Sequence, residues 1–125
     1  MIRISHVIKS IDLETGGPAR STTHLINELN EVNPNLHVTL NTFGTKNPII
    51  NEFENKNSIN FFTNNNYFYS TELRNDVIKS NYSLLHGQGI WEFPVHQMSA
   101  IAREFNIPYL ISPRGMLEPW SLDQK

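Results

Sequence analysis

The apolar positions along the chain fall into two patterns, one typical of buried strands and one typical of helices that pack on a sheet. Short apolar or alternating runs predict strands at residues 2–8, 36–43, 59–63, 82–86 and 108–112. Apolar residues three, four or seven positions apart predict helices at residues 22–32, 71–79 and 95–105. This succession of strands and helices predicts an α/β fold with an open parallel sheet.

Three loops directly follow predicted strands and carry glycines, aromatic residues or charged residues. These residues are Gly16 and Gly17 after the first strand, His86, Trp91 and Glu92 at and after the fourth, and Arg114, Glu118 and Trp120 after the fifth. Because the carboxyl ends of parallel strands meet at one edge of a sheet, the three loops are predicted to share one rim. A ligand cleft on that rim explains the clustering better than ordinary loop composition does.

The loop at Gly16, Gly17 and Pro18 has two interpretations. Glycines let a backbone turn sharply and approach a ligand, and proline suits the first position of a helix. The unpaired amides of that first turn would then favour an anion such as phosphate. The same three residues are also common in plain turns, and they match neither of the glycine-rich phosphate-binding motifs.

Other candidate residues also have a structural alternative. The guanidinium of Arg114 suits phosphate or carboxylate, or it forms a surface ion pair. Trp91 either stacks on a sugar face or fills the rim of the cleft. Glu92 and Glu118 would suit a glycosidase only if they faced each other, which nothing in the sequence indicates. His96, in the first turn of a predicted helix, is expected on the helix surface.

Composition excludes several classes of function. The chain has 125 residues, a formal charge of −2, a pI of about 6.2 and no cysteine. Without a basic stripe, nucleic acid and anionic membrane surfaces are poor partners. No histidine or acidic cluster has metal-ligand spacing, so no metal site is predicted. The first apolar run is too short for a signal sequence or a membrane span, which predicts a cytoplasmic protein.

Three segments together resemble the amino-terminal half of bacterial glycosyltransferases of family 4, which have the GT-B fold. They are residues 4–21 with the Gly-Gly-Pro loop, residues 85–91 (Leu-His-Gly-Gln-Gly-Ile-Trp), and residues 108–120, which contain Ser-Pro-Arg-Gly-Met-Leu-Glu-Pro-Trp. The last run is the most specific, and the resemblance is weakest from about residue 47 to residue 81. One departure is Leu84, where many relatives have a histidine.

The resemblance implies a Rossmann-like domain with helices on both faces, and a role for each candidate residue. Gly16 and Gly17 would approach the donor diphosphate, and His86 would contact the sugar at the reaction centre as a catalytic residue. Trp91, Glu92, Arg114 and Glu118 would line the cleft or meet the acceptor. The implied reaction transfers a sugar from a nucleotide-sugar donor to a saccharide or glycolipid acceptor in cell-surface polysaccharide synthesis. The anomeric configuration is retained, without a metal or another cofactor.

The resemblance also implies a second, carboxyl-terminal domain that holds the nucleotide sugar, so the 125 residues are interpreted as part of a longer enzyme. We therefore expect this piece alone to be inactive and to self-associate at high concentration. In the full-length enzyme, peripheral contact with the inner membrane face is an open alternative. A different class of function also stays open, a non-catalytic Rossmann-type module that binds a sugar or phosphate.

Overall fold

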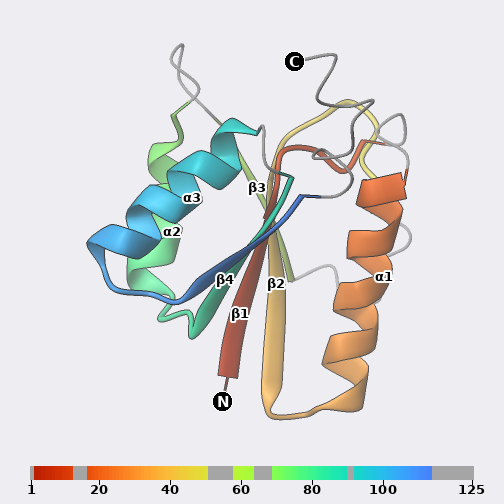
Figure 1. The fold of residues 1–125 in the computed structure, drawn as a ribbon. Helices are drawn as coiled ribbons and strands as arrows, with labels where there is room; N and C mark the ends of the chain where they lie inside the picture. Colours follow the sequence, from red (N-terminus) through yellow and green to blue (C-terminus); the bar gives the residue numbers. More distant parts are fainter. Residues whose placement is uncertain (1, 13–16, 51–57, 64–68, 90–91, 114–125) are drawn as a thin grey trace.

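The computed structural model describes residues 2–12, 17–50, 58–63, 69–89 and 92–113, with the backbone alone at residue 18. Strands and helices alternate within these residues (Figure 1). The strands are β1 (Ile2–Ile8), β2 (Leu36–Phe43), β3 (Ile59–Phe62), β4 (Leu84–Gln88) and β5 (Tyr109–Ser112). The helices are α1 (Gly17–Val32), α2 (Thr71–Lys79) and α3 (Phe93–Glu104).

The strands form one sheet in the order β3-β2-β1-β4-β5, and every neighbouring pair is parallel. This order confirms the predicted open, Rossmann-like α/β fold. From β1 the chain moves outward to β2 and β3, and it then returns to the other side of β1 as β4 and β5. The direction therefore switches between β1 and β4, where open α/β sheets bind ligands beyond the carboxyl ends of their strands.

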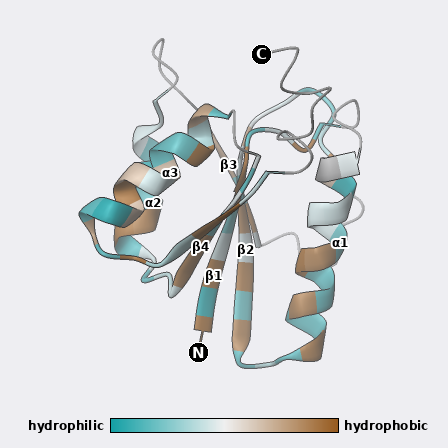
Figure 2. Ribbon diagram, viewed as in Figure 1, coloured by the Kyte–Doolittle hydropathy of each residue, from teal (hydrophilic) through white to brown (hydrophobic). Residues whose placement is uncertain are grey.

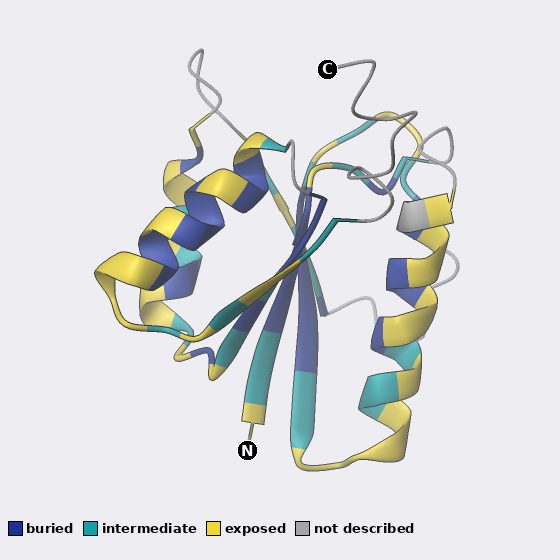
Figure 3. Ribbon diagram, in the orientation of Figure 1, coloured by how far each residue is buried: buried dark blue, intermediate teal, exposed yellow. Residues whose placement is uncertain are grey.

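Two hydrophobic cores lie on opposite faces of the sheet. Helix α1 covers one face, and α2 and α3 cover the other (Figure 1). The α1 core contains Ile8, Ile11, Ala19, Ile26, Val38, Leu40 and Ile49. The α2/α3 core contains Val7, Leu73, Val77, Tyr82, Leu85, Val95, Met98, Ile101 and Ala102. The central strands are therefore buried on both sides, and the hydrophobic stretches of the strands and helices follow this arrangement (Figures 2 and 3).

Helix α1 begins at Gly17, next to Pro18, which suited the first helical position, and before the periodic segment at residues 22–32. Polar residues on the packed face hid the periodicity of the first turns. Thr22 and Thr23 are fully buried between Ala19 and Ile26. The hydroxyl of Thr23 donates a 2.7 Å hydrogen bond to the carbonyl of Ala19, so this polar group is paired inside the helix. The packed face therefore includes threonines, whereas Leu25 is exposed.

Strand β4 is shifted from the predicted residues 82–86 to Leu84–Gln88. Asn81 has a φ of 57° and turns the chain before Tyr82, which lies outside the strand. Gly87, which we assigned to a loop, is a strand residue under α3. A Cβ at this position would lie 2.6 Å from Cγ1 of Val95, so glycine is needed for the close approach of the helix.

The side chain of Asn30 on α1 pairs with the backbone of β2. Its Nδ2 donates to the carbonyl of Val38 at 3.1 Å, and its Oδ1 accepts from the amide of Val38 at 2.8 Å. Strand β3 pairs only with residues 40–43 of β2. On the side away from β1, Val38 therefore has no strand neighbour among the described residues. Asn30 satisfies the two backbone groups in place of a strand.

Candidate functional site

The carboxyl edge of the sheet brings together the strand ends from which the three predicted binding loops begin. Strand β1 ends at Ile8, β4 at Gln88 and β5 at Ser112, and all run in the same direction. Of the predicted site and rim residues, Gly16, Trp91, Arg114, Glu118 and Trp120 lie outside the described residues. The geometry of the candidate site therefore rests on Gly17, His86 and Glu92, with the residues that contact them.

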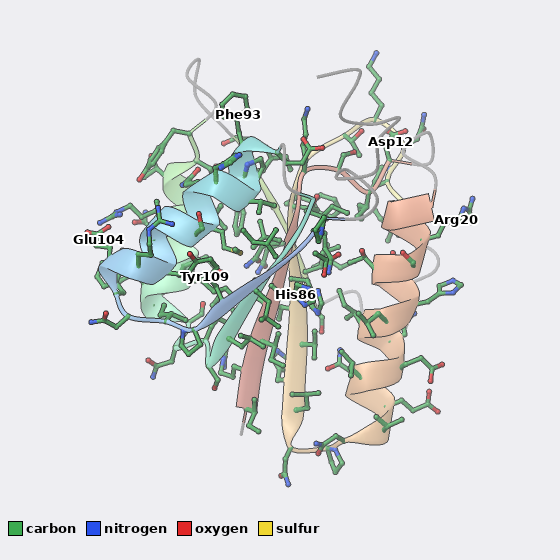
Figure 4. The ribbon with its side chains drawn as sticks, in the orientation of Figure 1. Asp12, Arg20, His86, Phe93, Glu104 and Tyr109 are labelled. Atoms are coloured by element: carbon green, nitrogen blue, oxygen red, sulfur yellow. The ribbon has the colours of Figure 1, made fainter. Side chains whose placement is uncertain are left out.

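His86 is the third of the five residues of β4, not the strand end that we predicted, because the strand continues to Gln88. It belongs to a group of four polar residues that we call the histidine cluster: His6, His86, Gln88 and Ser112. Gln88 and Ser112 end β4 and β5, so the cluster reaches the carboxyl edge. The Nε2 atom of His86 is 2.7 Å from Oγ of Ser112, and its ring centroid is 4.7 Å from that of His6. His86 is half-buried, and Figure 4 shows it in the centre of the sheet. Two neighbouring strands therefore fix its ring, β5 by a hydrogen bond and β1 by stacking.

His6 is buried, with 2 % of its surface exposed, and it also supports His86. Its Nδ1 lies 3.0 Å from Nε2 of Gln88. An amide nitrogen can only donate a hydrogen bond, so with this orientation of Gln88 the Nδ1 atom of His6 accepts. The proton of a neutral His6 is then on Nε2, which sets the tautomer of the ring that stacks on His86.

The histidine cluster lies on the α1 face of the sheet. His6 is in register with Leu40 on one side and with His86 on the other, and residues in register share a face. Leu40 packs in the α1 core with Ala19 from the first turn of the helix. The histidine cluster and the amino end of α1 therefore belong to the same side of the sheet.

Gly17 begins α1, as a phosphate-binding helix start requires, but neither its backbone nor its surroundings in the protein require glycine. Its φ is not in the left-handed region, and a Cβ would find no atom within 4 Å. The protein itself therefore has room for a side chain here. If Gly17 serves a function, its lack of a side chain matters to a ligand that approaches the exposed end of the helix.

Glu92 bridges the switch point by an ion pair. It is the residue before α3, and one of its carboxylate oxygens is 3.7 Å from Nζ of Lys9, which follows β1. The pair joins the loops after β1 and β4 across the crevice between those strands. His96 is exposed on α3, as expected for a surface histidine.

A pocket of about 260 Å³ opens on the α3 side of the same edge. Its lining comes from the ends of β1 and β2 and from the start of α3: Lys9, Ser10, Phe43, Gly44, Thr45, Phe93 and Pro94. We did not predict these residues as site residues. They come from three distant segments and match no motif, and only the prediction that strand ends share an edge could have suggested them.

A second polar group, the central network, lies on the α2/α3 face and contains Ser5, Asn41, Asn60, Asp76 and Tyr82. Asn41 donates to Ser5 and, at 3.2 Å, to Asp76, and it accepts from Asn60 at 2.9 Å. Tyr82 donates to Asp76 at 2.6 Å. Burial and the hydrogen bond to Asp76 raise the pKa of Tyr82. The members of the central network bond to one another beneath α2, as in a structural polar cluster.

Two searches of the described residues for particular features were negative. The described histidines and acidic residues form no group of three that could hold a metal ion. None of the described helices has the length and apolar character needed to cross a membrane.

Comparisons with known proteins gave no relative from which a function could be transferred. A search against protein-family models found no match to the chain, and searches of curated proteins and of solved structures found none either.

Proposed function

We propose that this chain is the acceptor-side, amino-terminal part of a retaining glycosyltransferase that transfers a sugar from a nucleotide-sugar donor to a saccharide or glycolipid acceptor. In this proposal His86 contacts the transferred sugar at the reaction centre. The amino end of α1 at Gly17 approaches the donor diphosphate, and the loops after β4 and β5 receive the acceptor. A second domain supplies the pocket for the nucleotide, and no metal or other cofactor takes part.

The observation that carries the proposal is the position of His86. It is half-buried on β4 beside the switch point, two residues before the carboxyl end of the strand, and Ser112 and His6 hold it on the α1 side of the sheet. A side chain fixed by its neighbours suits a reaction that depends on positioning. The resemblance of residues 85–91 and 108–120 to family 4 enzymes supplies the reaction class.

The proposed reaction requires stabilisation of charge more than covalent chemistry. As the glycosidic bond to the donor breaks, negative charge develops on the leaving diphosphate and positive charge on the sugar ring. Backbone amides at the start of a helix stabilise the first charge, because they are fixed dipoles that need no reorganisation. His86 would lie beside the sugar, with its ring orientation set before the substrate binds.

The test is a transfer assay on the protein expressed from its complete reading frame, with a panel of radiolabelled nucleotide sugars. We expect His86→Ala to lower kcat by roughly 100-fold or more, the typical loss when a positioned polar catalytic group is removed. His96→Ala is the matched control, because His96 is exposed on α3, and it should keep full activity.

Three results would count against the proposal. Full activity in His86→Ala would remove its assigned role. Turnover by the 125-residue chain alone would show that no second domain is needed. Binding of sugars or phosphates by the complete protein without turnover of any donor would favour the non-catalytic module.

A further inference from the structure

The pocket at the start of α3 is distinct from the histidine cluster and has its own chemistry. It lies between the ends of β1 and β2 on one side and Phe93 and Pro94 on the other. Phe43 and Val7 are on neighbouring strands and face α2 and α3, whereas His6 and His86 face α1. The carboxyl edge of the sheet therefore has one candidate site on each face.

The apolar part of the pocket comes from two phenyl rings and a proline. Phe93 is 54 % exposed, although it begins a helix whose following residues are buried. Figure 4 shows Phe93 at the carboxyl edge of the sheet. An exposed aromatic ring beside a pocket offers a flat apolar surface, which suits a ligand with a flat apolar face.

The charged groups in and around the pocket do not favour an anionic ligand. Lys9 is the cation of the lining, and it already pairs with Glu92 at 3.7 Å. A second carboxylate, that of Asp12, accepts a hydrogen bond from the hydroxyl of Thr45 and one of 3.1 Å from the amide of Asn47. A phosphate or carboxylate in the pocket would therefore meet one ammonium group, with two carboxylates bonded to lining residues close by.

The size of the pocket limits the ligand to a small unit. Its volume of about 260 Å³ is below the roughly 300–1,000 Å³ typical of pockets for drug-sized molecules. One ring fits this space better than an oligosaccharide or a whole nucleotide does. The hydroxyls of Ser10 and Thr45 and the Lys9–Glu92 pair provide hydrogen-bonding groups around the apolar walls.

We infer that this pocket binds a single neutral pyranose ring, with an apolar face of the sugar against Phe93 and Phe43 and its hydroxyls toward Lys9, Ser10 and Thr45. A pyranose has the required combination of C–H faces and a rim of hydroxyl groups. That this sugar is the acceptor unit rests on the proposed function. The binding of a neutral sugar rests on the pocket alone.

The test is a titration of the protein, followed by amide chemical shifts in NMR, with methyl glucoside, methyl galactoside and methyl mannoside as neutral probes. Glucuronate and adenosine are the anionic and aromatic comparison probes. At least one neutral glycoside should shift the amides of Lys9, Ser10, Gly44 and Thr45 at millimolar concentrations. Glucuronate and adenosine should shift them less at the same concentration.

Variants assign the binding to the pocket. We expect Phe93→Ala to raise the Kd for the bound glycoside about tenfold, which corresponds to about 1.4 kcal/mol. Lys9→Met should raise it about threefold or more, because a donor is lost. Phe105→Ala is the matched control, since Phe105 is an exposed phenylalanine just after the other end of α3. It should leave the Kd within twofold.

The outcomes separate this inference from the proposed function. Unchanged affinity in both Phe93→Ala and Lys9→Met, or no shifts with any glycoside, would overturn the pocket assignment even if the complete protein transfers sugar. Stronger binding of glucuronate or adenosine would overturn the ligand class. Glycoside binding with the expected variant pattern, in a protein without transferase activity, would support the pocket and refute the enzyme.

Discussion

Ser5 and His6 are neighbours in β1, yet they face opposite sides of the sheet and join different polar groups. Ser5 belongs to the central network, where Asn41, Asp76 and Tyr82 bond to one another. His6 belongs to the histidine cluster, which extends through His86 to Ser112 at the carboxyl edge. Both groups are largely buried, so burial of polar residues does not by itself identify a functional site. The useful difference is that only the histidine cluster reaches the strand ends where a ligand can approach.

The largest expected effect is a loss of stability when the central network, rather than the histidine cluster, is disrupted. Asn41→Leu removes the hydrogen bonds to Ser5, Asp76 and Asn60, leaving polar atoms without partners beneath α2. We expect the free energy of unfolding in urea to fall by about 3 kcal/mol, because buried unpaired groups keep their full desolvation cost.

Two controls make this comparison specific. Asn75→Leu, at an exposed position of α2, should change the free energy of unfolding by less than about 0.5 kcal/mol. Ser112→Ala, in the half-buried part of the histidine cluster, should cost less than about 1 kcal/mol. Equal losses of unfolding free energy in Asn41→Leu and Ser112→Ala would mean that the central network is no more important for stability than the histidine cluster.

A smaller effect concerns pH and involves the central network alone. Because burial raises the pKa of Tyr82 in the folded protein above the ordinary tyrosine value of 10.0, the unfolded chain releases this proton first as the pH rises. The stabilisation is therefore complete below pH 10 and is lost as the pH approaches the folded-state pKa.

Urea unfolding on either side of that pH tests this linkage. The wild type should lose more stability than Tyr82→Phe between about pH 9 and about pH 11, since phenylalanine has no proton to release. At neutral pH, Tyr82→Phe should cost about 1 kcal/mol through the lost hydrogen bond to Asp76. Parallel pH dependence in the two proteins would show that Tyr82 is not responsible.

The smallest change in stability is expected at Gly17, on the side of the histidine cluster. Gly17→Ala should raise the free energy of unfolding by about 0.5–1 kcal/mol, because the residue is helical and its Cβ meets no atom within 4 Å. Under the proposed function, the same change in the complete protein should lower sugar transfer tenfold or more, and Gly17→Val should lower it further. Glu28→Ala, exposed on α1, should leave transfer unchanged. Full transfer by Gly17→Val would remove the diphosphate role of this loop.

The fold followed from the sequence because its information is local. Each buried strand and amphipathic helix has its own periodicity, and the turn or cap residues between them, such as Ser70, act over a few positions. The predicted elements were wrong where a contact with a distant part of the chain, and not the local pattern, explains which amino acid is present. Gly87 resembled loop punctuation, yet it is a strand residue whose lack of a side chain lets Val95 approach.

The site was less predictable because it depends on which strands are neighbours. His86 was identified from family resemblance and from a predicted strand end, although β4 continues for two more residues. Its contacts with His6 and Ser112 arise from the pairing of β4 with β1 and β5. Lys9 and Phe93 meet the same pocket although no short motif joins them. A periodic pattern cannot encode such contacts, since it carries no information about strand order.

The pairing of Asn30 with Val38 has a consequence for how this protein avoids joining other copies of itself. The open part of β2 would otherwise present a backbone amide and carbonyl to which a foreign strand could add. One carboxamide occupies both groups and so blocks the addition of a strand beside Val38 of β2. Strand β5, at the opposite end of the sheet, exposes Leu110 and Ile111. The self-association that we expect at high concentration should therefore not involve this part of β2 while α1 remains folded, and it should use an edge strand such as β5.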